Sequence, residues 1–394
     1  MRNARIRSVE VWAVRGQAPP PDVERLQRQV RPSDAYRTPD DPRSDPPEHG
    51  TIERLYLTID TDAGAQGLYG PIDRAAAWVI VDQLAPALAG EDALAGAVTW
   101  DKLQRLDRHG RHGHFKMAIS AVDNALWDVR GRVLDAPVHQ LLGGPSRPRL
   151  RAYASTLGTA HDDAAIAATV ARLEAEGYRH QKWFFAHGPA DGAEGMERNV
   201  ALAARVRAAA GAGTRLMFDA FMGWDLAYAR AWVREAERYD VAWLEEPFPP
   251  MQYAAFAALQ RHTPIPLAAG EHLYDRAEAL AFVRDGVLSV LQTDPEWCGG
   301  VTELVRICAL AETFGVPVVP HGHGLHAAVH VVASQSPATC PLVEYLVHAM
   351  PRRHHFEVRP PRPVSAHVDV PSAPGFGIEL DEGRIESRRR WPFG

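Results

Sequence analysis

Three short apolar segments of this sequence each end in a carboxylate, and they follow one another at intervals of roughly 25 residues. The carboxylates are Asp219, Glu245 and Glu271. Such an interval holds one strand, one loop and one helix, which is the repeat of a barrel of parallel strands surrounded by helices. Neighbouring strands would bring the three side chains together at their carboxyl ends. Because clustered carboxylates repel one another, the pattern predicts a hard divalent cation at the mouth of a barrel.

The chain from residue 150 onward alternates strand-like and helix-like segments. Alternation of this kind predicts a parallel sheet, and eight strands without an interrupting linker predict closure of that sheet into a barrel. The eight strands are expected at residues 151–155, 180–185, 215–219, 241–245, 267–270, 290–294, 316–320 and 342–345.

The first part of the chain predicts a smaller α+β domain. Strand-like alternation at the start and again near residue 55 indicates a small antiparallel sheet. Helices are expected at residues 75–88, 98–106 and 115–134. A Gly-Gly-Pro sequence then interrupts the pattern. We therefore expect an N-terminal domain over residues 1–145, a barrel over residues 146–347, and a C-terminal segment, residues 348–394, that returns to the first domain.

A stretch without periodicity, residues 16–50, separates the first two expected strands and is rich in Pro, Asp and Arg. A loop of this length inside a domain is often a lid or a binding loop. Its side chains are therefore candidates to reach a substrate. The candidates are Arg31, Tyr36, Arg37 and His49. Of these we expect Arg37 to contact the substrate.

The composition excludes several classes of protein. With 394 residues and 46% hydrophobic content, the chain can bury a large core. A net charge of −6 indicates neither a nucleic-acid footprint nor a basic membrane patch. The three cysteines show neither a zinc nor a disulfide pattern, which fits a reducing compartment. No apolar stretch of about 18 residues is present. We expect a cytoplasmic protein that acts on a small molecule.

Ionisable residues stand near the carboxyl end of nearly every expected barrel strand. Active sites of barrels lie at this face because the strand tips and the following loops meet there. One polar strand end is weak evidence, because every strand becomes polar where it leaves the core. Seven of them in phase favour a functional site. In strand order they are Lys182, Asp219, Glu245, Glu271, Asp294, His321 and Glu344.

The charges of these residues suggest their roles. Carboxylate oxygens suit Mg²⁺, and the lack of cysteine or clustered histidine among them disfavours zinc. Such a metal can bind a substrate carboxylate and stabilise the enediolate that forms when the α-proton is removed. That chemistry needs a base beside the metal, and Lys182 lies on one side and His321 on the other. Asp294 could hydrogen-bond the His321 ring, fix its tautomer and raise its basicity.

Other interpretations of these residues stay open. Lys182 could lie on the surface. The aromatic residues that follow it indicate a buried strand, however, and burying a lysine without a function costs free energy. His323 is an alternative to His321 as the base, or a contact for the substrate. His272 either reaches the substrate or only solvates its loop. Glu246 follows a proposed ligand, and strand alternation predicts that it points to the opposite side and has a structural role.

Motifs spread over nearly the whole chain resemble those of a known family. The chain is similar to the enolase superfamily in its mandelate-racemase-like branch, and most of all to acid-sugar dehydratases such as L-rhamnonate dehydratase. The motifs are AISAVDNALWD at residues 118–128, LLGG at 141–144, LMFD at 216–219, WLEEP at 243–247, GEH at 270–272, QTDP at 292–295, WCGG at 297–300, VPHG at 319–322 and PGFG at 374–377.

The resemblance implies an α/β fold in which a TIM-like (β/α)7β barrel carries an N-terminal α+β capping domain, and a homo-oligomer. It implies Mg²⁺ on the three carboxylates of the repeat and proton abstraction by His321 with Asp294. In the dehydratases the β-hydroxyl then leaves, giving a 2-keto-3-deoxy acid. Glu344 matches an acid that hydrogen-bonds the substrate carboxylate in racemase-like members.

Two features depart from the family pattern. Racemase-like members carry Lys-x-Lys on the second strand, whereas Lys182 is followed by Trp183 and Phe184. A single lysine disfavours racemisation with two bases, and Lys182 could instead neutralise or orient the substrate carboxylate. The loop over residues 16–50, which helps to select the substrate in this family, is long here.

The sequence therefore predicts a Mg²⁺-dependent dehydratase of an aldonate-type sugar acid. The alternative in the same superfamily is a cycloisomerase or an epimerase or racemase of a related sugar acid. An alternative of a different class is a catalytically silent barrel that binds a sugar acid.

Overall fold

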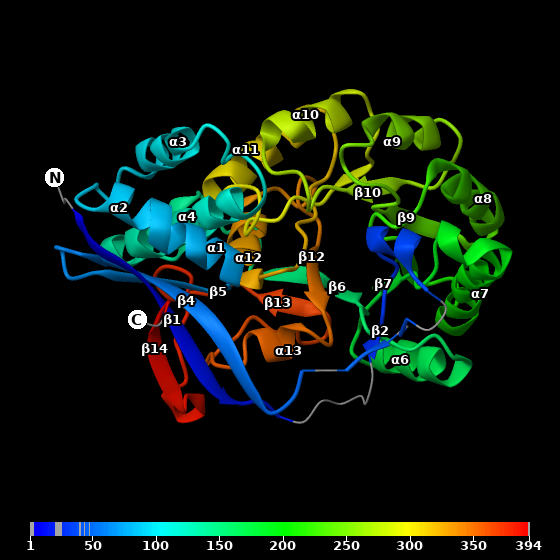
Figure 1. The fold of residues 1–394 in the computed structure, drawn as a ribbon, viewed down its shortest axis with the longest axis horizontal. Helices are drawn as coiled ribbons and strands as arrows, with labels where there is room; N and C mark the ends of the chain where they lie inside the picture. The colour runs from blue at the N-terminus through cyan, green and yellow to red at the C-terminus, as the bar shows by residue number, and fades with distance from the viewer. Residues whose placement is uncertain (1–3, 20–25, 39–40, 43, 47, 393–394) are drawn as a thin grey trace.

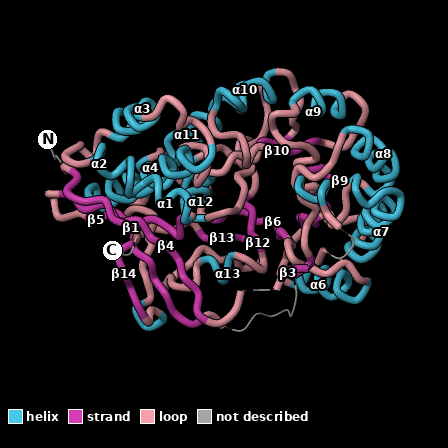
Figure 2. Tube along the Cα trace, in the orientation of Figure 1, coloured by secondary structure: helices cyan, strands magenta, loops and turns pink. Residues whose placement is uncertain are grey.

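In the computed structural model, which describes residues 4–19, 26–38, 41–42, 44–46 and 48–392, a curled parallel sheet surrounded by helices lies beside an antiparallel sheet with its own helices (Figure 1). The predicted fold class is confirmed. None of the helices within these residues is long and apolar enough to cross a membrane. Figure 2 shows the helices on the outer side of the barrel and the strands on its inner side.

The antiparallel sheet combines the beginning and the end of the chain. Its strand order is β14-β1-β4-β5, and Val11 of the central strand pairs with Leu57 on one side and Trp391 on the other. The last strand of the chain therefore completes the N-terminal half. The strands are β1 (Ile6–Gln17), β4 (Thr51–Thr61), β5 (Gln66–Ile72) and β14 (Ser387–Trp391).

The helices of this half cover one face of the sheet (Figure 1). The helix expected at residues 75–88 is divided into α1, a π-helical segment (Ile80–Leu84) and α2. The other two expected helices are present with boundaries close to those predicted. The helices are α1 (Arg74–Val79), α2 (Ala85–Leu88), α3 (Gly96–Leu106), α4 (Gly113–Leu134) and α5 (Val138–Leu141).

Helix α4 joins the two halves of the molecule. Its apolar residues pack toward the sheet, and its polar residues bind the start of α11 in the barrel half. Asn124 Oδ1 accepts a hydrogen bond from Val301 N at 2.9 Å, and Asp123 Oδ2 accepts one from Thr302 N at 2.9 Å. The free amide groups at the start of a helix need such acceptors. This contact fixes the position of one half against the other.

The barrel strands are parallel and follow the order β11-β10-β9-β8-β7-β6-β12. The seventh expected strand, residues 316–320, is reduced to one bridge between Leu291 and Val318. Pro317 and Pro320 lack the amide hydrogens that a longer ladder needs, which explains the short pairing. The strands are β6 (Arg149–Ser155), β7 (His180–Phe184), β8 (Arg215–Asp219), β9 (Val241–Glu245), β10 (Leu267–Ala269), β11 (Val290–Leu291) and β12 (Val343–Leu346), with β13 (His367–Asp369) antiparallel to β6.

The barrel helices alternate with these strands. Three of them begin at an aspartate whose carboxylate accepts an amide hydrogen of the first turn: Asp162, Asp225 and Asp275. The helices are α6 (Asp163–Ala175), α7 (Gly192–Ala210), α8 (Leu226–Ala236), α9 (Tyr253–Gln260), α10 (Arg276–Arg284), α11 (Gly300–Thr313), α12 (Leu325–Ser334) and, in the C-terminal segment, α13 (Met350–Arg353).

The described part of the loop at residues 16–50 reaches across to the barrel. It contains two short paired strands, β2 (Leu26–Gln27) and β3 (Ser44–Asp45), and a 3-10 helix (Pro32–Tyr36). Backbone hydrogen bonds join it to the loops that follow β6 and β7, from Gln27 N to Gly158 O at 2.9 Å and from Val30 N to Phe185 O at 2.7 Å. In Figure 1 this segment lies beside β7.

Asp128 on α4 connects three separate parts of the chain. Its buried carboxylate accepts hydrogen bonds from Leu68 N and Phe376 N, each at 2.8 Å, and from Arg132 Nε at 2.6 Å. Burial raises the pKa of Asp128, against the lowering effects of Arg132 and the two amides. Three donors therefore hold this buried carboxylate.

We predict that Asp128→Asn lowers the free energy of unfolding by about 3 kcal/mol, because one carboxylate oxygen is replaced by an amide that cannot accept from its donors. Urea unfolding followed by circular dichroism measures this. Asp101→Asn is the matched control, because Asp101 also pairs with an arginine four residues later, Arg105 at 2.9 Å, but on the surface. An equal effect of the two substitutions would contradict the role of Asp128.

Candidate active site

The pairing of neighbouring strands brings the three repeat carboxylates to one end of the barrel. Asp219 at the end of β8 lies directly opposite Glu245 at the end of β9. Glu271 comes two residues after β10, which pairs with β9 on the other side. All three side chains are buried. The structure therefore places them together, as the spacing in the sequence predicts.

Burial and mutual repulsion make these carboxylates hard to ionise. Burial is the largest effect and raises the pKa of Asp219 to about 6, of Glu271 to about 7 and of Glu245 to about 8, and each is raised further by a neighbouring carboxylate. Such a group gains from a compensating cation. Because all of the donors are carboxylate oxygens, the set suits a hard divalent metal.

Glu246 joins this group, so the prediction that it points to the opposite side is wrong. Strand β9 ends at Glu245, and Glu246 has a left-handed backbone with φ 37°, so the alternation of the strand does not continue. Its buried carboxylate lies 2.9 and 3.0 Å from His272 Nδ1. Ligand atoms of Glu246, Glu271 and His272 all lie within 4.8 Å of one another. We call Asp219, Glu245, Glu246 and Glu271 the carboxylate cluster.

Lys182 of β7 provides a positive charge inside the carboxylate cluster. Its Nζ bonds Glu245 and lies 2.9 Å from Glu344 Oε1 and 3.3 Å from Asp219 Oδ2. Burial alone would lower the pKa of Lys182, but these carboxylates raise it well above its usual value. The side chain is thus held as an ammonium. The ring of Phe184 lies 5.2 Å from Nζ, at the position where a second lysine would stand.

His321 and Asp294 form a hydrogen-bonded pair beside the cluster. His321 Nδ1 lies 2.8 Å from Asp294 Oδ2, and His321 Nε2 lies 3.4 Å from Glu271 Oε2. Burial opposes the charged ring, but Glu271 and the bond to Asp294 raise the pKa of His321 to about 10. The Asp294 bond holds Nδ1 and leaves Nε2 toward the cluster.

Glu344 lies inside β12 and closes the other side of the site. Its Oε2 accepts a hydrogen bond from Gly322 N at 2.9 Å. Burial would raise the pKa of Glu344, but Lys182 and His321 lower it to about 2. Its carboxylate is therefore ionised beside these two side chains.

Trp297 and His323 complete the wall above these groups. The Trp297 ring lies 5.0 Å from the His321 ring, 4.8 Å from that of His323 and 5.6 Å from that of His272, between centroids. His323 Nε2 lies 3.1 and 3.2 Å from the carboxylate oxygens of Asp73. Sequence reasoning missed Asp73, because no spacing connects a residue of the N-terminal half with the barrel. Trp297 was part of a family motif but had no role assigned.

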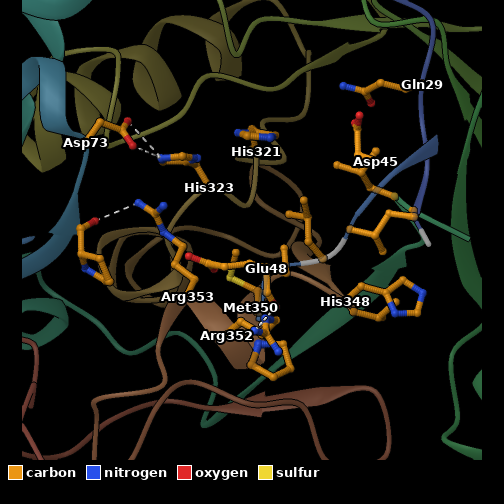
Figure 3. Close-up of a pocket in the computed structure, with 18 of the residues that line it drawn as sticks. Gln29, Asp45, Glu48, Asp73, His321, His323, His348, Met350, Arg352 and Arg353 are labelled. Atoms are coloured by element: carbon orange, nitrogen blue, oxygen red, sulfur yellow. Dashed lines mark hydrogen bonds and ion pairs between the residues drawn. The ribbon is translucent and has the colours of Figure 1, made fainter. Parts of the chain in front are cut away.

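A cavity of about 950 Å³ opens over this site, between the two halves of the molecule (Figure 3). Glu271, Trp297, His321 and His323 line it from the barrel, and Asp73 lines it from the N-terminal half. The N-terminal loop and the C-terminal segment contribute further lining residues, among them Arg28, Gln29, Arg31, Asp45, Met350, Arg352 and Arg353.

Only Arg31 of the four loop candidates lines this cavity in the described structure. Arg37 points elsewhere, with Nη1 4.0 Å from Asp191 Oδ1 beside α7. Tyr36 and His49 are exposed. Basic residues of the loop line the cavity. The loop has no sequence pattern from which these particular residues could be predicted.

Two family models match the chain. The model described as "Enolase C-terminal domain-like" matches residues 165–384, and the one described as "Mandelate racemase / muconate lactonizing enzyme, N-terminal domain" matches residues 55–143. The chain is 33% identical over 322 residues to the L-rhamnonate dehydratase of Saccharopolyspora erythraea, covering 79% of each protein.

Solved structures show the same architecture. The rhamnonate dehydratase of Gibberella zeae complexed with Mg is 25% identical, with a TM-score of 0.84, over 98% of this chain and 96% of that chain. The 3,6-anhydro-D-galactonate cycloisomerase of Zobellia galactanivorans is 26% identical, with a TM-score of 0.78, over 97% of this chain and 100% of that chain.

We predict that Glu246 keeps His272 protonated. Burial disfavours the charged ring, but the bond to Glu246 and its charge raise the pKa of His272 to about 9. His272 therefore holds its proton up to about pH 9, and Glu246→Gln should lower this pKa well below 9, because burial then dominates. Histidine NMR of the metal-free protein from pH 5 to 10 measures the change. Glu235→Gln, on the surface of α8, should leave the titration unchanged; a His272 pKa that is equal in both variants would contradict the pairing.

Proposed function

Because the chain belongs to the enolase superfamily and is a hydro-lyase, we propose that it removes water from an aldonate-type sugar acid with Mg²⁺ as its cofactor. The reaction takes the proton α to the carboxylate and releases the β-hydroxyl, and its product is a 2-keto-3-deoxy acid. The similarity to L-rhamnonate dehydratase supports the type of reaction and the class of substrate.

One observation carries the proposal: a histidine held by an aspartate lies beside the buried carboxylate cluster, and His321 and Glu271 line one cavity, which we call the chamber. His321 Nε2 lies 3.4 Å from Glu271 Oε2, so a substrate carboxylate bound at the cluster would bring its α-carbon near this nitrogen. A general base must lie within reach of the proton that it removes, and its pKa matters only when this geometry is met.

The residues fit Mg²⁺ on the chemistry of the donors. We propose Asp219, Glu245 and Glu271 as its ligands, with Glu246 as a neighbouring carboxylate that the sequence did not predict for this place. When bound, Mg²⁺ would neutralise the buried carboxylates and supply positive charge for the negative charge that develops on the substrate carboxylate.

The roles of the remaining residues follow from their contacts. With the charge of Glu271 offset by a bound cation, the His321 ring would be neutral and can take the α-proton at Nε2, while Asp294 orients the ring through Nδ1. Lys182 is held as an ammonium by three carboxylates, so we assign it to charge compensation and binding of the substrate carboxylate. Glu344 bonds Lys182 and Gly322 and positions them at the same end of the substrate. We propose His323, which lines the cavity, and His272, which is bonded to Glu246, as further substrate contacts from the loops.

Reaction with one base is favoured over racemisation with two. The second strand offers an ammonium and an aromatic ring, Lys182 and Phe184, opposite His321. A cycloisomerase is the second candidate, because the chain has a similar fold and 26% identity to a 3,6-anhydro-D-galactonate cycloisomerase. That reaction would begin with the same enediolate and divert it.

A panel of sugar acids incubated with Mg²⁺ in D₂O tests the proposal. We expect at least one substrate to give a 2-keto-3-deoxy acid, read by reaction of the 2-keto group with semicarbazide. Exchange of the α-hydrogen for deuterium without loss of water, across the whole panel, would contradict dehydration and favour isomerisation.

We predict that His321→Asn abolishes the removal of the α-proton but not metal binding. Asparagine can still bond Asp294 but cannot accept the proton, so α-hydrogen exchange and product formation should both fall by roughly 10²- to 10⁴-fold. Calorimetry should give a Kd for Mg²⁺ close to that of the wild type. Exchange that persists in this variant would transfer the role of base to His323 or Lys182.

We predict that Glu245→Gln removes activity by weakening Mg²⁺ binding. The amide keeps the shape of the side chain but removes a negative charge from the proposed ligand set. Calorimetric titration with Mg²⁺ measures the affinity, and circular dichroism checks the fold. Glu197→Gln, at the surface of α7, is the control. An unchanged affinity for Mg²⁺ would exclude Glu245 as a ligand.

A further inference from the structure

A second histidine–aspartate pair faces the same chamber as His321 and Asp294. His323 lies two residues after His321, and its Nε2 lies 3.1 Å from one oxygen of Asp73 and 3.2 Å from the other. Asp73 immediately precedes α1, in the N-terminal half of the molecule. Figure 3 shows His323 between Asp73 and His321, with all three facing the cavity.

The two pairs use opposite nitrogens of their rings. Asp294 binds Nδ1 of His321 and leaves Nε2 facing the chamber, whereas Asp73 binds Nε2 of His323 and leaves Nδ1. Within the described part of the chain, no residue hydrogen-bonds His323 Nδ1. The two ring centroids are 6.3 Å apart, and the ring planes differ by 18°. Two separate atoms for proton transfer therefore lie beside one chamber.

A network across the two halves holds this second pair in place. Burial raises the pKa of Asp73, but the bond and the charge of His323, with Arg353, lower it to about 2, so its carboxylate is ionised. Glu296 Oε2 lies 3.8 Å from His323 Nε2. Tyr69 bonds Glu296 at 3.1 Å and Arg353 bonds it at 2.9 Å. A protonated His323 would thus face one carboxylate directly and a second one nearby.

We propose that His323 is the general acid that protonates the departing β-hydroxyl and that Asp73 is the residue that positions it. This inference rests on the proposed dehydration. It divides the two proton transfers between the two histidines: His321 removes the α-proton, and His323 supplies the proton that leaves with the hydroxyl. A hydroxyl is a poor leaving group unless it is protonated. The reaction therefore needs a general acid near the β-carbon, which a residue that only contacts the substrate would not provide.

The proton and electron balance needs no further reactant. His321 Nε2 takes the α-proton, and the electron pair of the broken C–H bond enters the substrate enediolate. That pair then forms the double bond between the α- and β-carbons, the β-carbon–oxygen bond breaks, and the proton from His323 Nδ1 leaves with the oxygen as water. The enol becomes the ketone by gaining at the β-carbon the proton that His321 took, and it returns its hydroxyl proton to His323, so both histidines regain their starting states.

A purely structural explanation of the pair is a tether between the two halves. The halves are already joined by α4 and α11, by the sheet that contains β14, and by Arg353. A tether would act on stability, and its loss would lower every step of the reaction together. A general acid acts on the loss of the hydroxyl alone, and this difference can be measured.

The test uses the full-length protein with Mg²⁺ and the sugar acid that the wild type dehydrates fastest. In His323→Asn and in Asp73→Asn, we expect 2-keto product to fall by roughly 10²-fold or more, while exchange of the α-hydrogen with D₂O persists and exceeds product formation. The analogue that carries fluorine in place of the β-hydroxyl needs no proton to depart, so both variants should release fluoride at close to the wild-type rate. Asp82→Asn, an exposed substitution in the helical segment after α1, should behave as the wild type.

Two results would overturn the inference. One is a parallel fall of exchange, dehydration and fluoride release in His323→Asn, which would assign His323 to substrate binding or structure. The other is full dehydration by either variant. Failure of the proposed function itself looks different, because it appears in the wild type as α-hydrogen exchange without 2-keto product.

Discussion

The burial of four carboxylates at the ends of three neighbouring strands is the constraint on which this molecule depends. A buried carboxylate is disfavoured by loss of water and by its neighbours, and in the carboxylate cluster both effects raise the pKa values of Asp219, Glu245 and Glu271. Lys182 and two histidines supply opposing charge from adjacent strands and loops. An excess of buried negative charge would destabilise an ordinary core, but here it favours the binding of a divalent cation. Burial of the carboxylates therefore costs stability and at the same time creates the metal site.

The chamber above the cluster is built by both halves of the molecule. The barrel contributes the histidines and Trp297, the N-terminal half contributes Asp73, and the C-terminal segment contributes Arg353. Helix α4 fixes the relation of the halves through its bonds to the start of α11. A small shift of the N-terminal half would therefore move Asp73 relative to His323 while leaving His321 and Asp294 in place. The two histidine pairs depend on different parts of the fold, which suits two separable proton transfers.

Local rules of sequence reading failed where the backbone departs from regular geometry. Alternation along β9 placed Glu246 on the wrong side, because the strand ends one residue earlier and the backbone turns to a positive φ. The seventh strand was expected at full length, but the prolines on both sides of Val318 and Val319 leave only one bridge. The loop at residues 16–50 contains several basic residues, and no sequence pattern distinguishes those that reach the cavity. In the structure Arg31 lines the cavity, whereas Arg37 lies beside Asp191.

The sequence by itself determined the α/β repeat, the positions of the three carboxylates and the pairing of His321 with Asp294. It could do so because each depends on periodicity and on the rule that parallel strands end at one face. Tertiary structure alone decided that Glu246 joins the carboxylates and that Asp73, some 250 residues before His323 in the chain, becomes its partner. No local pattern encodes a contact between halves, because it arises from how α4 and the barrel pack together and not from any spacing along the chain.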